Sequence, residues 1–357
     1  MGREKNLSVG QFSLVCLCAV GLILPVSTMW SRAETIPAKS AELKYQEIPV
    51  SLISETSQLT FAGDKAGEGY FSQDGKKMIF QSERPLPADL QKKGPNPFYQ
   101  IYLMDLKSGK TELVSPGMGK TTCSWIHPDL KRALFSSTHL DPQFPEKVKA
   151  ELEQRRNPVK KGYAWSFDDQ YDIFSVDLRT KKLTQLTHEL GYDAEASYSP
   201  DGKWIVFASN RAGYDPQQLA KLSAEDRALF AKDPSYLMDL YLMAADGTHV
   251  QQLTTTLGYD GGPFFSSDGK KITWRRFSPN GAQAEIMTMD LATKVEKQVT
   301  SLGAMSWAPF FHPSGDYIVF TSSVLGYSNF ELFAVDVEGK HLPIRVTKWE
   351  GFDGLPV

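Results

Sequence analysis

Short stretches in which apolar and polar residues alternate recur along the chain, and tight turns separate them. Residues 198–207 (YSPDGKWIVF) read as a strand, an Asp-Gly turn and a second strand. Residues 71–80 (FSQDGKKMIF), 265–274 (FSSDGKKITW) and 311–320 (FHPSGDYIVF) repeat this pattern, and residues 126–135 (IHPDLKRALF) are a degenerate copy. Period-two alternation across an Asp-Gly turn predicts a β-hairpin in each copy.

Each copy is followed by a second predicted hairpin with its own signature. Its first strand reads IYLMDL at residues 101–106, and its last strand ends in QLT at residues 185–187 and 252–254. Four short antiparallel strands thus recur about every 46 residues, which is typical of a propeller blade. We therefore predict an all-β propeller with blades near residues 61–114, 115–187, 188–254, 255–300 and 301–347.

The SPDGK hairpin and the Leu-Thr strand ending resemble the WD40-like PD40 repeat of TolB-like β-propellers. The resemblance covers roughly residues 54–357 and implies four-stranded antiparallel blades. It also implies a protein- or peptide-binding scaffold in the bacterial cell envelope. The stretches GYDGGPFF (258–265) and GAMSWAPFFHPSGD (303–316) look like propellers that precede zinc aminopeptidase domains. The alternative is therefore the substrate-docking propeller of an exported peptidase whose catalytic domain lies beyond Val357.

Both ends of the repeat array carry partial copies. Residues 57–60 (SQLT) match the fourth-strand ending but precede the first hairpin, so we expect them to complete the last blade. Residues 351–356 (GFDGLP) copy residues 258–263 (GYDGGP), which places the start of a sixth blade at residues 348–357 after five complete blades. On this reasoning the chain is expected to be a fragment of a longer product.

The N-terminal residues have the pattern of a secretory signal. The basic residues Arg3 and Lys5 precede an apolar run at residues 12–26, and small residues before Glu34 suit cleavage. We predict a signal peptide at 1–33, a linker at 34–53, and a periplasmic or secreted product; an uncleaved anchor is the alternative. Because only a short linker is predicted before the repeats, we do not expect the resemblance to TolB to include its N-terminal α/β domain.

Composition narrows the class of protein. The 357 residues are 41% hydrophobic and 23% charged, with a formal net charge of −3, which is ordinary for a soluble globular protein. Without a strongly basic stretch, a nucleic-acid partner is not expected. We expect a monomer with no membrane span after signal cleavage. The cleaved chain would keep one cysteine, Cys123, so no internal disulfide is expected.

Three long insertions are expected on one face of the ring, opposite the Asp-Gly turns. They cover residues 83–100, 139–168 and 211–237. Residues 145–156 (PEKVKAELEQRR) predict a helix in the second blade, and Ser223 is placed to cap a helix in the third. Long loops on a rigid scaffold commonly carry binding sites, although shielding of the ring is the other interpretation.

The links between blades carry acidic residues that are expected near the mouth of the channel. Asp193, Asp260 and Asp353 are the Asp residues of these links. Glu195 lies two positions after Asp193, and Glu68 occupies the equivalent position in the first blade. Such a ring could attract a basic peptide or a divalent cation, unless each Asp merely caps a turn. Arg275 either meets a carboxylate there or lies solvated at a strand end, the interpretation we favour. The candidate binding residues are Tyr192, Asp193, Glu195, Tyr259, Asp260, Asp353, Glu68, Ser306, Trp307 and Arg275.

Other prominent residues are interpreted as structural. Most aromatic side chains on or near the first two strands of the blades are assigned to packing between blades rather than to a ligand cage; the set is Trp125, Trp204, Trp274, Trp307, Phe264 and Phe310. The turn motif is assigned the same kind of role at Asp74, Gly75, Asp201, Gly202, Asp268, Gly269 and Gly315.

Catalytic motifs are missing from the sequence. It contains no Gly-x-Ser-x-Gly elbow, no His-Glu-x-x-His helix, no phosphate loop and no dinucleotide fingerprint. The six histidines are scattered rather than set at metal-ligand spacing. We therefore expect neither a cofactor nor a metal, and predict that the domain is not an enzyme by itself.

Overall fold

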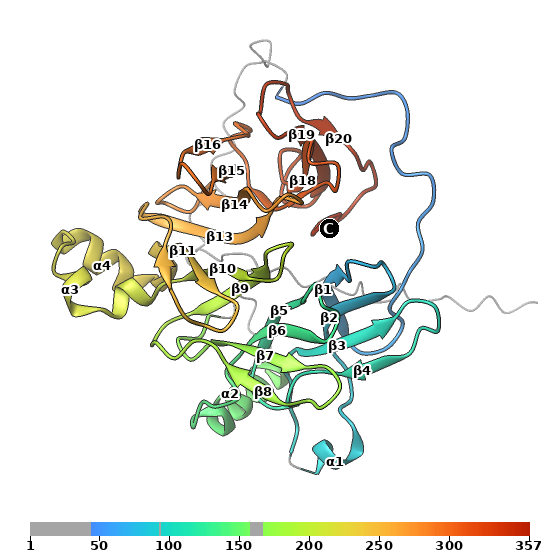
Figure 1. The fold of residues 1–357 in the computed structure, drawn as a ribbon, viewed down its shortest axis with the longest axis vertical. Coiled ribbons are helices and arrows are strands. Elements are labelled where there is room, and N and C mark those ends of the chain that lie inside the picture. Colours follow the sequence, from blue (N-terminus) through green and yellow to red (C-terminus); the bar gives the residue numbers. More distant parts are fainter. Residues whose placement is uncertain (1–43, 93, 158–166) are drawn as a thin grey trace, which may run out of the picture.

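The computed structural model describes residues 44–92, 94–157 and 167–357, and within them the protein is built from four-stranded antiparallel units (Figure 1). The first unit holds β1 (Lys65–Phe71), β2 (Lys77–Glu83), β3 (Gln100–Asp105) and β4 (Thr111–Leu113). The second holds β5 (Thr121–Ile126), β6 (Arg132–Ser137), β7 (Asp172–Asp177) and β8 (Leu183–Gln185). The third holds β9 (Asp193–Tyr198), β10 (Trp204–Ser209), β11 (Leu237–Ala244) and β12 (Gln251–Gln252).

The last two units have the same order of strands. The fourth holds β13 (Gly258–Phe265), β14 (Lys271–Phe277), β15 (Ala284–Asp290) and β16 (Glu296–Gln298). The fifth holds β17 (Ser306–Phe311), β18 (Tyr317–Ser322), β19 (Glu331–Asp336) and β20 (Ile344–Arg345). A short parallel pairing of β11 with β13 joins the third and fourth units into one continuous sheet.

The predicted Asp-Gly hairpins are present, and their turns share one hydrogen-bond pattern. In the first unit the Ser72 hydroxyl donates to Asp74 Oδ1 (2.7 Å), which also accepts from the Lys76 backbone N–H (3.2 Å). Gly75 has a φ of +66°, a conformation that a side chain would strain. The serine, aspartate and glycine of the motif therefore each have a local structural role.

The Leu-Thr strand ending is explained by a second repeated contact. In the fourth unit the Thr300 hydroxyl accepts from the Ile286 backbone N–H (2.9 Å) and donates to the Glu285 carboxylate (2.5 Å). Equivalent hydroxyls accept from the third strand in the other units: Ser115, Thr187, Thr254 and Thr347. This hydroxyl satisfies a buried N–H where the short fourth strand has ended.

Neighbouring units pack face to face through buried hydrophobic clusters. Phe135 and Phe174 of the second unit share a cluster with Ile79 and Ile101 of the first. Further clusters join the second unit to the third, the third to the fourth and the fourth to the fifth. The opposite face of the first unit has a cluster of its own, which contains Met78, Phe80, Tyr102 and Met104.

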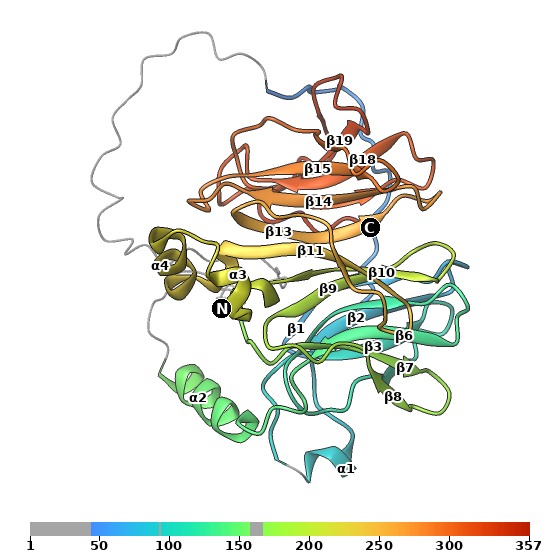
Figure 2. The same ribbon diagram turned by 60° about the vertical axis from the view of Figure 1, so that its left-hand side comes forward.

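The first strand of each unit lies on the inside of this arrangement. β1 lies against β5, β5 against β9, β9 against β13, and β13 against β17. The stacked sheets and their order are visible in Figure 2. Residues on these five strands therefore meet at the centre of the fold.

The helices lie in the three long insertions. α1 (Ala88–Gln91) is in the first insertion and α2 (Phe144–Arg156) is in the second. α3 (Pro216–Leu219) and α4 (Ala224–Lys232) are in the third, where the Ser223 hydroxyl accepts from the Asp226 N–H at the start of α4 (3.0 Å). The sequence predicted α2 and α4 but not the two short helices. In Figure 2, α2, α3 and α4 lie on the same side of the sheets.

The expected outer strand at residues 57–60 is not formed, which corrects the sequence interpretation. Leu59 is 42% exposed and residues 57–60 form no strand, whereas Gln46 pairs with the edge of β20. The Gln46 N–H donates to Pro343 O (2.7 Å), and the Arg345 N–H donates to Gln46 O (3.0 Å). Tyr45 anchors this segment by packing edge-on against Phe333. From there the chain runs across to the first unit (Figure 1).

The predicted signal peptide at 1–33 and part of the predicted linker at 34–53 lie outside the described residues. In the part of the chain that the structure does describe, no helix is long and apolar enough to cross a membrane.

Candidate binding site at the centre of the fold

Each inner strand carries a β-bulge at the same point. Pairing with the second strand shifts there, and the bulged residue has positive φ. Bulges of this kind re-aim side chains and are common beside functional sites. The equivalent residues are Glu68, Cys123, Glu195, Gly262 and Ala308, and Leu355 has the same conformation in the C-terminal GFDGL segment.

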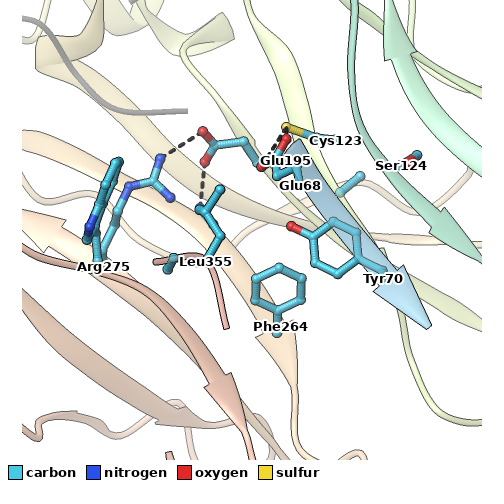
Figure 3. A pocket seen from close by; sticks show the side chains of 12 residues that line it. Glu68, Tyr70, Cys123, Ser124, Glu195, Phe264, Arg275 and Leu355 are labelled. Carbon is cyan, nitrogen blue, oxygen red and sulfur yellow. Dashed lines mark hydrogen bonds and ion pairs between the residues drawn. The ribbon is translucent and has the colours of Figure 1, made fainter. Parts of the chain in front are cut away.

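These bulged residues line one small central cavity (Figure 3). Its volume of about 30 Å³ leaves room for ordered water rather than for an organic ligand. Two positions further along the strands, four aromatic rings meet with centroids 5.0–6.0 Å apart: Tyr70, Trp125, Phe264 and Phe310. This cluster joins strands of four different units around the centre of the fold.

Glu195 is held on one side of the cavity by three donors. The Tyr259 hydroxyl donates to Oε1 (2.5 Å), the Gly262 N–H donates to Oε2 (2.6 Å), and Arg275 Nη2 donates to Oε1 (2.8 Å). Arg275 is only 4% exposed. The favoured interpretation of Arg275 as a solvated strand end was therefore wrong, because the carboxylate that neutralises it comes from the neighbouring unit.

On another side of the cavity, Glu68 meets a cysteine that the sequence interpretation did not select. The Cys123 Sγ lies 3.6 and 3.7 Å from the two Glu68 carboxylate oxygens and 3.2 Å from the Thr122 hydroxyl. The signal that could have found Cys123 is its repeat position, which is equivalent to Glu68 and Glu195. Its different side-chain chemistry concealed that equivalence.

Fewer acidic residues line the cavity than the sequence suggested. Asp193 is completely buried and binds Arg211 Nη2 (2.5 Å), and Asp260 binds Arg276 through both oxygens (2.8 and 2.7 Å). Burial raises the pKa of both carboxyls. Neither lines the cavity, since each lies two residues before the bulged position. The carboxylates on the cavity wall are those of Glu68 and Glu195.

The remaining candidates divide between the cavity and the contacts between units. Trp307 lines the cavity and packs against Phe330 and Phe352. Ser306 does not line the cavity, and its hydroxyl lies 3.2 Å from the Ser322 hydroxyl. Tyr192 is buried and packs against Phe167 and Tyr171. Asp353 does not line the cavity, and burial raises the pKa of its carboxyl.

The aromatic residues of the first two strands differ in burial. Trp204 is 40% exposed on β10 and is an exception among them, whereas Trp274 and Trp307 are almost fully buried. Among residues 44–92, 94–157 and 167–357, no group of three or more His, Cys, Asp or Glu side chains could hold a metal ion.

Comparison with known proteins places the fold. No family model matches the chain. The Tol-Pal system protein TolB of Francisella tularensis subsp. holarctica (strain OSU18) is 30% identical over 221 residues, covering 52% of this chain and 50% of that protein. The structure of a putative TolB from Agrobacterium tumefaciens matches 80% of this chain and 82% of its own, with a TM-score of 0.52 and 20% identity. The chain resembles a TolB-like β-propeller.

TolB from Acinetobacter baumannii shows the same similarity of fold, with a TM-score of 0.50 and 21% identity over 78% of this chain and 57% of its own. The chain spans about half the length of the curated relatives it matches.

Proposed function

We propose that this protein is a non-catalytic scaffold that binds a protein or peptide in the bacterial cell envelope. In this proposal the four-stranded units are successive blades of a β-propeller, and residues 348–357 begin a further blade. Residues 1–33 act as a cleaved signal, 34–53 as a linker and 54–357 as a monomeric periplasmic propeller. Similarity to Tol-Pal system proteins supports the compartment and the class of partner.

The observation that carries the proposal is the shape of the central site. Five inner strands hold bulges with positive φ, four of them at residues other than glycine, and the bulged residues line one cavity of about 30 Å³. Sites for small organic molecules usually enclose about 300–1,000 Å³. A site this small suits recognition of a macromolecular surface, from which at most the terminal group of one side chain reaches the cavity.

The chemistry of the site favours a partner with a basic or hydrogen-bonding side chain. The Glu195 carboxylate is bound by Arg275, and the Glu68 carboxylate lies beside the Cys123 thiol on the cavity wall. Trp307 and Leu355 add apolar surface to the same wall. An acidic group beside apolar side chains can form a charge-assisted hydrogen bond with the terminal group of a Lys or Arg residue.

The test is binding of the full chain to purified Pal of a Tol-Pal system, measured by isothermal titration calorimetry. Glu68→Gln keeps the shape of the site and should weaken binding at least tenfold, whereas Glu338→Gln on an exposed turn should not change it. Absence of binding by the wild type at micromolar concentrations, or equal binding by Glu68→Gln, would overturn the proposal. Hydrolysis of aminoacyl p-nitroanilides by the pure chain would contradict its non-catalytic part.

A further inference from the structure

Arg84 stands out when equivalent positions in the units are compared. Its guanidinium carbon lies 5.0 Å from the Phe80 ring centroid and 4.7 Å from that of Tyr102, on the face of the first unit that none of the other described units covers. Arg211 occupies the same position in the third unit, 5.3 Å from both rings of the equivalent aromatic pair. The two arginines therefore share one structural environment.

The two arginines differ in their counter-ions. Arg211 forms an ion pair with Asp193, which pairs with Ser209 across the strands. In the first unit the residue at the Asp193 position is Ala66, opposite Ser82. Within the described residues, the side chain of Arg84 donates to the hydroxyls of Ser82 (3.1 Å) and Thr111 (3.3 Å) and forms no ion pair.

The other described units show no unpaired arginine at the position of Arg84. In the fourth unit this position is Ser278, and Asp260 pairs instead with Arg276, the residue opposite it on the neighbouring strand. The second has Thr121 at the Asp position and His139 at the Arg position, where burial lowers the pKa of the histidine. The fifth has the neutral Ser306. Among the described units, only the first keeps the arginine and lacks the carboxylate.

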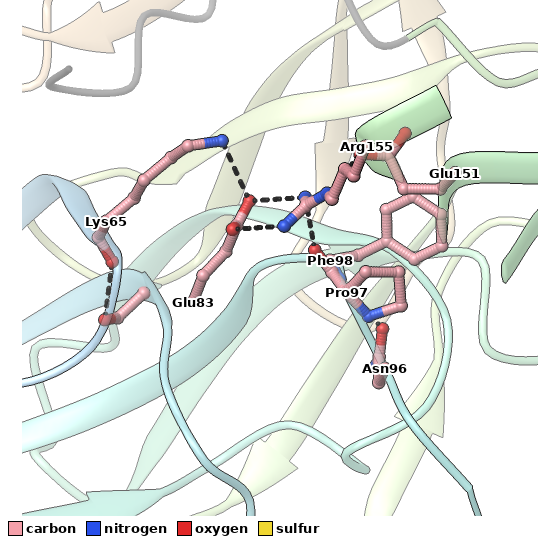
Figure 4. Close-up of polar contacts among 8 residues, drawn as sticks. Lys65, Glu83, Asn96, Pro97, Phe98, Glu151 and Arg155 are labelled. Carbon is pink, nitrogen blue, oxygen red and sulfur yellow. Dashed lines mark hydrogen bonds and ion pairs between the residues drawn. The ribbon is translucent and has the colours of Figure 1, made fainter. Parts of the chain in front are cut away.

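No neighbouring carboxylate of the described residues replaces the one that Asp193 provides to Arg211. Both Glu83 oxygens are bound by Arg155, and one of them also by Lys65, as Figure 4 shows. Asp64 lies beside Arg84 but forms no ion pair with it within 4 Å. The Tyr102 ring lies under the guanidinium, and its buried hydroxyl has no hydrogen-bond partner in the described part of the chain.

A pocket of about 510 Å³ opens beside Arg84. Its lining includes Leu86 and three proline residues, Pro85, Pro95 and Pro97, which have no side-chain hydrogen-bonding groups. The lining also holds two cations, Arg84 and Arg155, and two carboxylates, Asp64 and Glu83. Arg155 is bound to Glu83, so Arg84 is the cation of this lining that forms no ion pair within the described residues. Such a cation beside apolar walls suits an extended polypeptide that presents one acidic side chain.

We propose that Arg84 is the receptor for a carboxylate carried by an acidic residue of a partner polypeptide, which occupies this pocket. The carboxylate takes the place that Asp193 holds on Arg211. A guanidinium fixed over two rings presents its donors in a rigid fork, which favours a carboxylate over a neutral group. The site is separate from the central cavity, so it stands or falls independently of the function proposed above.

The test uses the full chain and an N-acetylated, amidated hexaglutamate peptide, with hexaglutamine as the uncharged probe and inorganic phosphate as a free anion. Ala66→Asp should supply the missing carboxylate from within the protein and so exclude the peptide. Ala66→Asn has the same shape without the charge. Hexaglutamate should raise the melting temperature of the wild type and of Ala66→Asn by about 2–4 °C at saturation, but not that of Ala66→Asp or Arg84→Ala.

Three results would overturn the proposal. The first is no shift of the wild type with millimolar hexaglutamate, and the second is the same shift in all four proteins, which indicates non-specific binding. The third is an equal shift with phosphate, which indicates a free-anion site instead of a polypeptide site. If Ala66→Asp fails to fold, the wild type and Arg84→Ala are compared with the three probes. A shift of the wild type by hexaglutamate that Arg84→Ala lacks supports the proposal, and equal shifts of the two proteins overturn it.

Discussion

The stability of this protein should decrease between pH 5 and pH 7 because of one buried carboxyl group. Asp239 on β11 is 6% exposed, and burial together with the nearby Asp260 raises its pKa to about 8. Its carboxyl accepts from Gln252 Nε2 (2.9 Å) and from the Thr254 hydroxyl (3.3 Å). The folded protein therefore keeps the Asp239 proton throughout this pH range.

The magnitude follows from proton linkage. In the unfolded chain an Asp carboxyl has a pKa near 3.9, so it has lost its proton by pH 5. While the folded state binds one proton more than the unfolded state, the free energy of unfolding falls by about 1.4 kcal/mol per pH unit. Asp239 alone should thus reduce the free energy of unfolding by about 3 kcal/mol between pH 5 and pH 7.

Asp239→Asn isolates this contribution, because Asn cannot titrate. An amide is compatible with the position, since Gln100 occupies it in the first unit and accepts from the Ser115 hydroxyl (2.7 Å). Urea unfolding followed by circular dichroism at pH 5, 6 and 7 should show that the stability advantage of the wild type over the variant shrinks steadily. Asp246→Asn, in an exposed turn of the same unit, serves as the control, with a constant difference. A flat or rising difference for Asp239→Asn would refute the reasoning.

Three further substitutions test the contacts that organise the units. Thr300→Val should cost about 1–3 kcal/mol, because the buried Ile286 N–H loses its acceptor. Arg276→Met should cost about 3–5 kcal/mol, because it leaves the buried Asp260 carboxylate without its cation. Ser223→Ala should cost about 1 kcal/mol through loss of the N-cap of α4. All three are measured as changes in the urea-unfolding midpoint.

Each of these has its own control and contrary result. Thr293→Val, in an exposed turn of the same unit, should leave the free energy of unfolding nearly unchanged. A loss of stability equal to that of Thr300→Val would show that the effect does not come from the buried Ile286 N–H. Replacing Asp260 and Arg276 together by Asn and Met should recover part of the loss from Arg276→Met, and no recovery would argue against an uncompensated charge. For α4, Ser223→Asp should retain the cap, so a loss equal to that of Ser223→Ala would contradict the capping argument.

Local signals account for what the sequence predicted well. Turns with Asp and Gly form through contacts within about five residues, so the hairpin at residues 71–80 was readable from those residues alone. The helix at 145–156 was also readable, because a proline and an acidic residue start it and basic residues end it. In such elements the determining contacts lie inside the segment.

Contacts between units were harder to predict, because their partners are far apart in sequence. Arg275 meets Glu195 across 80 residues, and no local pattern shows that this pair exists. The bulge positions were also hidden, since Glu68, Cys123 and Ala308 share a backbone conformation and not a side-chain type. For the same reason, the sequence did not indicate which carboxylates line the cavity and which are buried with arginines.

The pairing of Gln46 with β20 has a consequence for how the protein reaches its folded state. The segment is the first to leave the ribosome among the described residues, yet Glu47 binds Arg345 across 298 residues. Contacts of such long sequence separation require a large loss of chain entropy before they form. The segment must therefore wait for nearly the whole chain, and its docking is expected as a late, separate kinetic phase that shields the outermost strand from intermolecular pairing.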